Sequence, residues 1–188
     1  MTSLILIRHG QTDWNASGRW QGQADPPLND RGRRQALRTA EDLSGQQPAA
    51  LYSSDLRRAL ETARIVAVKF GLAIVPEPRF REINLGQWQG MLSTEIEDKY
   101  PDEFRRWHTA PLSVRPPGGE DIPTLAARVL AAINEIIALY PDQSVAVVAH
   151  EFPITVIVSR SMGLGLENLR DQIQGTGTWR QITVSGAL

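Results

Sequence analysis

Near the N-terminus, the stretch Leu4-Ile5-Leu6-Ile7-Arg8-His9-Gly10 joins a short apolar run to an arginine and a histidine. Four consecutive apolar residues have the length of a buried strand, and the glycine marks its end. A second run, Val145-Ala146-Val147-Val148-Ala149, ends in the same way at His150. Unbroken apolar runs are typical of parallel strands covered on both faces. We therefore predict two central strands, each followed by a histidine.

Segments with the helical spacing of apolar residues separate these runs. Predicted helices begin near residues 30 and 56, cover 93–109 with a break at Pro101, and cover 122–139 and 153–161. Shorter strands are predicted at 49–52, 72–75 and 182–184, and the polar residues 10–29 are predicted to form a long functional loop. This alternation predicts an α/β fold, a three-layer α/β/α sandwich on a mostly parallel sheet.

In a sheet of this kind, ligands bind outside the carboxyl ends of the strands. The pair Arg8-His9, the segment Ser53–Arg58 and His150 all follow predicted strands. We therefore expect these three segments to meet at one crevice. A single histidine in a protein is more often structural than catalytic, but two of the three histidines here lie at the expected ligand edge.

The composition of the chain argues against several classes of function. The 188 residues fit one domain, are 41% hydrophobic and carry a formal net charge of -1, which argues against a general nucleic-acid or anionic-membrane binder. The lack of cysteine excludes a disulfide scaffold, a thiol nucleophile and a cysteine metal site. No signal peptide is expected, and no apolar stretch reaches the about 18 residues of a membrane span. A cytoplasmic location fits these observations.

The segment Arg8-His9-Gly10-Gln11-Thr12-Asp13-Trp14-Asn15 resembles the motif R-H-G-E/Q-T-x-W-N of the histidine phosphatase superfamily, also called the phosphoglycerate mutase-like family. Further segments resemble that family in the same order along the chain. They are Gln21-Gly22 with Pro27–Gly32, Ser53–Ala63, Arg81–Gly90, Gly118–Asp121 and Val147–His150. The resemblance spans nearly the whole chain and implies a phosphoglycerate mutase-like fold, with a small helical cap at about 84–120.

The resemblance also implies a mechanism. His9 is the expected nucleophile toward phosphorus, while Arg8, Arg58 and His150 are expected to bind the phosphoryl oxygens. Glu82 is expected to protonate the leaving oxygen and then activate water. The remaining expected substrate-binding residues are Asn15, Gln21, Gly22 and Glu151. The superfamily needs no metal and no cofactor, and the expected partner is a small phosphorylated metabolite, with a homodimer left open.

Two positions depart from the family pattern. Glu151 stands where glycine is common, and a carboxylate beside a phosphate dianion is repulsive. We expect its side chain either to point away or to serve as a second acid or a substrate selector. Leu85 replaces a residue that is polar in some members, which predicts an apolar wall. His108 is expected to be a surface or lid residue, and Trp107 a packing residue.

The leading hypothesis is a metal-independent phosphomonoester phosphatase that works through phospho-His9. One alternative is a phosphoglycerate mutase, but family mutases that use bisphosphoglycerate carry a long insertion between the Glu82 and Gly118 regions. Here only residues 91–117 join them, which favours the short phosphatase branch. A second alternative is a non-catalytic phosphate-binding protein on the same fold, which is expected to lose one of the catalytic residues; none is lost.

Overall fold

The two apolar runs form adjacent central strands, β1 (Thr2–Arg8) and β4 (Ser144–Ala149), in the computed structural model. It describes the backbone of residues 1–188 and all side chains except those of Asn168, Arg170 and Asp171. The sheet has the order β3-β2-β4-β1-β5, with β2 at Ala50–Ser53, β3 at Ile74–Pro76 and β5 at Trp179–Val184. β5 pairs antiparallel to β1, and the other strand pairs are parallel.

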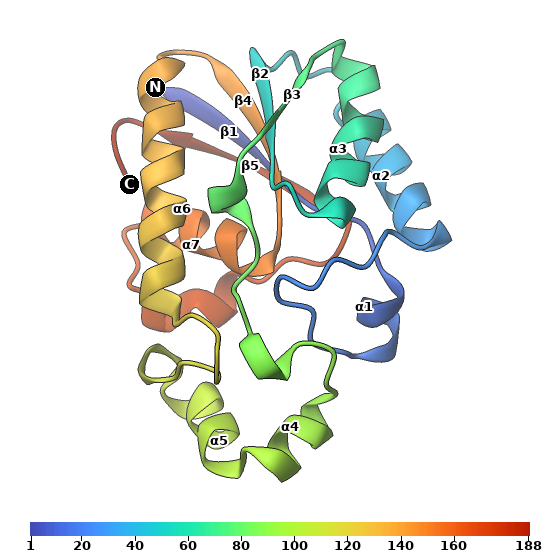
Figure 1. Cartoon of the computed structure of the whole chain (residues 1–188). Helices are drawn as coiled ribbons and strands as arrows, with labels where there is room; N and C mark the ends of the chain where they lie inside the picture. Colours follow the sequence, from blue (N-terminus) through green and yellow to red (C-terminus); the bar gives the residue numbers. More distant parts are fainter.

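Both faces of the sheet are covered by helices, so alternate residues of one strand enter different cores. Leu4 and Leu6 share a core with α6 (Ile122–Leu139) and α7 (Glu151–Ser161). Ile5 and Ile7 face α2 (Asp30–Asp42) and α3 (Arg57–Phe70) on the other side. Figure 1 shows these helix pairs on opposite sides of the sheet, which confirms the predicted three-layer α/β/α sandwich.

Two of the helices that cover the sheet, α2 and α6, begin at a residue whose side chain caps them. Asn29 accepts a hydrogen bond from the Gly32 amide at the start of α2. Asp121 accepts one from the Thr124 amide at the start of α6. Contrary to our expectation, α6 has the length and mean hydropathy, 1.6, of a membrane-crossing helix, the one such helix in the described part of the chain. Its buried residues pack into the core on one face of the sheet.

Short helices connect β3 to α6, and the two α-helices among them lie beyond the carboxyl edge of the sheet (Figure 1). They are the 3₁₀ turns η1 (Pro78–Phe80), η2 (Gly86–Trp88) and η3 (Pro111–Ser113), with the helices α4 (Ser93–Lys99) and α5 (Pro101–Thr109). The predicted break at Pro101 is confirmed, because this proline begins α5. Trp88 and Trp107 stack edge to face here and belong to the same core as α6.

Several details differ from the sequence prediction. Strand β2 lies at 50–53 instead of 49–52, and α7 begins at residue 151 instead of 153. The predicted loop 10–29 contains a one-turn helix, α1 (Asp13–Ser17), and a 3₁₀ helix, η4 (Leu166–Gln172), follows α7. Strand β3 lies at 74–76 instead of 72–75, and β5 extends over 179–184 instead of 182–184. Thr12 explains α1, because its hydroxyl accepts from the Asn15 amide while the Asn15 side chain accepts from the Thr12 amide.

Candidate active site

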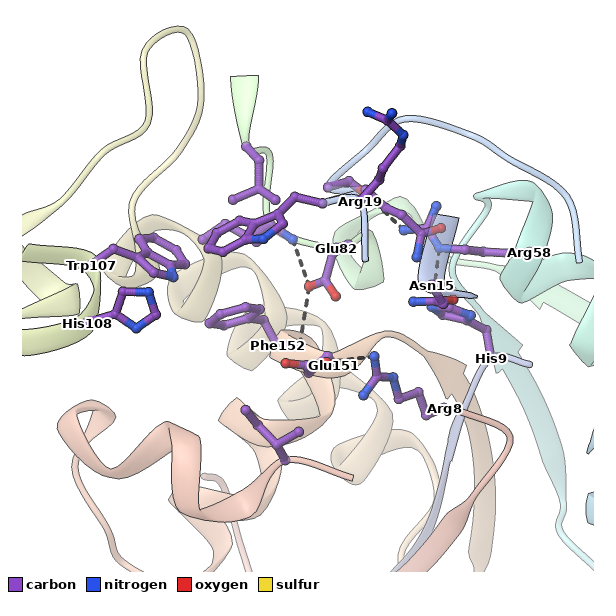
Figure 2. A pocket seen from close by; sticks show the side chains of 16 residues that line it. Arg8, His9, Asn15, Arg19, Arg58, Glu82, Trp107, His108, Glu151 and Phe152 are labelled. Atoms are coloured by element: carbon purple, nitrogen blue, oxygen red, sulfur yellow. Dashed lines mark hydrogen bonds and ion pairs between the residues drawn. The ribbon is translucent and has the colours of Figure 1, made fainter. Parts of the chain in front are cut away.

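Chain segments that are far apart in the sequence surround one cavity of about 380 Å³ (Figure 2). Arg8 and His9 follow from β1, Arg58 lies in the first turn of α3, and Glu151 opens α7. Glu82 comes from the coil after η1, and α1 and the loop after it supply further lining residues. The structure therefore brings together the segments that the sequence placed at the carboxyl edge of the sheet.

His9 is held as a neutral ring with a defined tautomer. Its Nδ1 lies 2.7 Å from the Gly10 carbonyl oxygen, which can only accept. Its Nε2 receives a hydrogen bond from Nε of Arg58 at 3.2 Å, and a guanidinium can only donate. The proton is therefore on Nδ1 and the lone pair on Nε2. Burial, and then the charges of Arg58 and Arg8, hold the pKa of His9 well below its usual value.

Arg58 is almost fully buried, which the apolar stripe of its helix did not predict. Besides His9, its guanidinium donates to the carbonyls of Ala24 at 2.7 Å and Gly22 at 2.8 Å. These bonds fix the plane of the side chain and leave two of its five N–H groups for a ligand. Burial lowers the pKa of Arg58 to about 10, so it remains charged at neutral pH.

Arg8 lies on the other side of His9 and is paired inside the cavity. One terminal nitrogen donates to the Gln174 carbonyl, and the other lies 2.6 Å from the Glu151 carboxylate. Its buried Nε has no hydrogen-bond partner among the described residues. The expectation that the Glu151 side chain points away from the phosphate position is wrong. The carboxylate faces the cavity and neutralises Arg8 (Figure 2).

Glu82 is a buried carboxyl group whose pKa lies near neutral pH. One oxygen accepts from the amides of Ile83 at 2.9 Å and Phe152 at 3.2 Å. Burial raises the pKa of Glu82 to about 7, helped by the negative charge of Glu151. The Ile83 amide and the two arginines oppose this shift but do not cancel it.

His150 stands at the N-cap position of α7, where its side chain makes no capping hydrogen bond. It is fully buried and is not one of the residues that line the cavity. Its ring centroid lies 5.0 Å from that of His9, and its Nε2 lies 2.8 Å from the Ser54 hydroxyl. Its buried Nδ1 has no hydrogen-bond partner among the described residues. Burial, and next the charge of Arg58, lower the pKa of His150 well below its usual value.

Asn15, Gln21 and Gly22 line the cavity. Gln21 and Gly22 each hold another residue of the site in place. Asn15 accepts from the Thr12 amide and hydroxyl, each at 3.1 Å, so its own amide group is the part left for a ligand. Gln21 accepts from the same hydroxyl at 2.9 Å. The carbonyl of Gly22 holds Arg58, and a φ of +51° explains the glycine.

The rest of the cavity wall is mostly apolar. Leu85 lies here, as expected, with other apolar and aromatic side chains: Trp20, Ile83, Trp107, Phe152 and Ile173. Trp107, expected only to pack, and the exposed His108 both line the cavity as well. Arg19 lies at the rim and donates to the Gly90 carbonyl at 2.6 Å, with Glu95 at 3.5 Å. This wall suits the organic part of a small ligand.

The structure adds positioning residues that we did not predict. The Thr62 hydroxyl accepts from the Gly10 amide and donates to the Arg58 carbonyl, and so links two site segments. Arg128 of α6 donates to the carbonyls of Arg79, Arg81 and Glu82 at 2.7–3.0 Å. Thr62 lies in a family-like segment, but Arg128 lies in none. Only the tertiary structure could reveal the role of Arg128.

A metal site is not evident from side-chain grouping. Among the residues that the structure describes, no three histidine or acidic side chains are grouped in a way that could hold a metal ion. The positive charges that face the cavity are guanidinium groups, with the N-terminal ends of α3 and α7 beside them. Guanidinium forks and helix N-termini are both suited to bind phosphate.

Curated relatives share most of this chain. Phosphoserine phosphatase 1 of Hydrogenobacter thermophilus is 39% identical over 166 residues, covering 88% of this chain and 79% of that protein. The metal-independent phosphoserine phosphatase of Arabidopsis thaliana is 32% identical over 197 residues, covering 97% and 83%. The probable phosphoglycerate mutase GpmB of Yersinia pestis is 34% identical over 168 residues, covering 87% and 76%.

Solved structures agree in fold and length. Bacillus stearothermophilus YhfR superposes with a TM-score of 0.93 at 33% identity, covering 100% of this chain and 93% of that one. A mycobacterial glucosyl-3-phosphoglycerate phosphatase in complex with VO3 gives 0.88 at 35% identity, covering 96% and 92%. The family model described as histidine phosphatase superfamily (branch 1) matches residues 4–187. This chain therefore belongs to the histidine phosphatase superfamily, branch 1.

Proposed function

We propose that this protein is a metal-independent phosphomonoester phosphatase that forms a phosphohistidine on His9. The observation that carries the proposal is the state of the His9 ring. Its proton is on Nδ1, and its Nε2 lone pair faces Arg58 inside a buried cavity. A neutral imidazole with a directed lone pair is a nucleophile, whereas a protonated ring is not. The lowered pKa of His9 keeps that nucleophile available at neutral pH.

The reaction takes two displacements at phosphorus. In the first, His9 Nε2 forms a bond to phosphorus, the ester P–O bond breaks, and the leaving oxygen takes the proton of Glu82. In the second, Glu82 takes a proton from water, the water oxygen bonds to phosphorus, and the His9 N–P bond breaks. A pKa of about 7 lets Glu82 act as the acid in one step and as the base in the next.

The arginines supply the charge stabilisation that phosphoryl transfer requires. Nε of Arg58 donates to His9 Nε2, so an incoming phosphoryl oxygen has to take over that N–H group. Arg8, with its buried free Nε, and His150 complete the set of donors, together with the amide group of Asn15. The two guanidinium groups offer two positive charges to a phosphate dianion, and one of them is paired with Glu151 in this structure.

The substrate that we propose is a small phosphorylated metabolite. The cavity volume of about 380 Å³ lies in the range of small-molecule sites. We assign residues 84–120, which contribute Leu85 and Trp107 to the wall, as a helical cap over it. The names of the phosphatase relatives support this substrate class, and a cytoplasmic location fits it. Gln21 and Gly22 shape the site through Thr12 and Arg58.

A screen of phosphorylated metabolites with a strong chelator present tests the proposal. We expect release of inorganic phosphate from para-nitrophenyl phosphate and from a subset of metabolites, undiminished by the chelator. Loss of activity that added metal restores contradicts the metal-independent mechanism. Following 3-phosphoglycerate isomerisation in parallel tests the mutase alternative, since a mutase has to return the phosphoryl group before water reaches phospho-His9.

A further inference from the structure

Glu151 places an uncommon negative charge in the phosphate-binding half of the cavity. Its carboxylate lies 2.6 Å from a terminal nitrogen of Arg8, and its side chain is 25% exposed. It is close enough to Glu82 to raise the pKa of that buried carboxyl group. Figure 2 shows Glu151 below Glu82 with Arg8 at its side. In this structure Arg8 therefore serves as the counter-ion of Glu151.

Substrate binding disturbs this charge balance. A phosphate ester dianion carries two negative charges, and Arg8 and Arg58 supply two positive charges beside His9. Both histidines are neutral, because burial holds each pKa well below its usual value. Arg19 at the rim already has Glu95 as a partner. Once phosphate takes Arg8, the carboxylate of Glu151 is left without a counter-ion.

Resting on the proposed function, we propose that Glu151 is a specificity-determining residue that selects aminoalkyl phosphates, phosphomonoesters with an ammonium group near the ester oxygen. Such a substrate brings both charges at once: its phosphate displaces Glu151 from Arg8, and its ammonium group becomes the new partner of the carboxylate. A neutral substituent leaves Glu151 unpaired, and a carboxylate at the same place is repelled.

The wall beside Glu151 suits a cation as well. Phe152 follows Glu151 in the chain, and its ring centroid lies 5.8 Å from that of Trp107, which lines the same cavity. Aromatic faces attract an ammonium group through the charge distribution of the ring. The aromatic wall and the carboxylate together form a site for a small organic cation next to the phosphate position.

The test compares two esters of nearly equal shape. The first is 2-aminoethyl phosphate, whose amine is protonated at pH 7.5, and the second is neutral propyl phosphate. We expect wild type to show a kcat/KM for 2-aminoethyl phosphate that is about 10-fold higher than that for propyl phosphate, the effect of a partly screened charge pair.

Three variants test whether Glu151 causes this preference. In Glu151→Gln, which keeps the shape of the side chain, the ratio of the two kcat/KM values should fall to about 1. Glu151→Asp, which keeps the charge, should retain a preference. Glu41→Gln, an exposed change on α2, is the matched control.

Calorimetric binding of 2-aminoethylphosphonate and propylphosphonate, which cannot be hydrolysed, separates this proposal from the catalytic one. If wild type binds the amino compound more tightly and Glu151→Gln does not, Glu151 selects the cation even where no ester is turned over. Equal binding of the two phosphonates and equal kcat/KM of the two phosphate esters in wild type overturn the proposal, whether or not the variants fold. A preference for the amino compound that persists in Glu151→Gln overturns the proposal too. In both cases, hydrolysis of the two phosphate esters by the wild type still supports the proposed function.

Discussion

Replacing Glu82 with glutamine should stabilise the folded protein at high pH and remove most of its turnover. The side-chain oxygen that accepts from the Ile83 and Phe152 amides has a counterpart in glutamine, so both hydrogen bonds can persist. The charge cannot persist. Burial, together with the charge of Glu151, raises the pKa of Glu82 from 4.5 to about 7.

The sign and size of the stability change follow from that pKa. The folded protein holds the Glu82 proton more tightly than the unfolded chain does, so this contribution to stability is complete below pH 4.5. It is lost as the pH rises through about 7. At about 1.4 kcal/mol per pH unit, the difference amounts to about 3 kcal/mol. Glutamine has no charge to bury, so Glu82→Gln should be more stable than wild type by up to about 3 kcal/mol at pH 8.

Urea denaturation of both proteins between pH 4.5 and pH 8 gives the difference directly. The titration of His9 and His150 affects both proteins and largely cancels in the comparison. Turnover of alkyl phosphates should fall by about 10²- to 10⁴-fold, because an alkoxide leaves poorly without a proton donor. Stability curves that run parallel from pH 5 to pH 8 would refute the raised pKa and, with it, the acid role of this carboxyl group.

Three further changes probe other parts of the site. Glu151→Gln removes a negative charge beside the phosphate position, so inorganic phosphate should inhibit about 10-fold more strongly at pH 7.5; unchanged inhibition contradicts this. Arg128→Gln loosens the segment that carries Glu82, so kcat should fall by about 10-fold more for ethyl phosphate than for 2,4-dinitrophenyl phosphate, whose leaving group needs no proton. Equal losses contradict a positioning role. Gly10→Ala places a methyl group 2.3 Å from the Gly32 carbonyl oxygen and should cost about 2 kcal/mol in urea denaturation; wild-type stability contradicts this close approach.

The sequence predicted a strand or helix best where the apolar pattern and the caps of that element lay within a single segment. The apolar runs ending at Ile7 and Ala149 predicted the two central strands, and the capped segment 122–139 predicted α6 to the residue. The helix at 13–17 was missed, because it is one turn long and polar. Strand β5 was predicted too short, because its buried and exposed residues mix along an edge of the sheet.

Site residues were predictable when strand ends and family-like motifs marked them. His9, Arg58 and Glu82 line the cavity as expected, whereas His150 is buried beside His9, with ring centroids 5.0 Å apart. The catalytic roles of all four stay predictions. The partners of these residues were not predictable in the same way. Arg128 reaches the carbonyl of Glu82 from a helix 46 residues away, and the rotamer that pairs Glu151 with Arg8 follows from packing.

Rapid quenching of the enzyme with a ³²P-labelled substrate, followed by mapping of the labelled peptide, tests the central claim most directly. The ring of His9 donates from Nδ1 to Gly10 and holds its lone pair on Nε2. We therefore predict an acid-labile phosphoryl group on His9, attached to Nε2, that forms and decays at rates compatible with turnover. A label on another residue, or turnover with no covalent label at any quench time, contradicts the account.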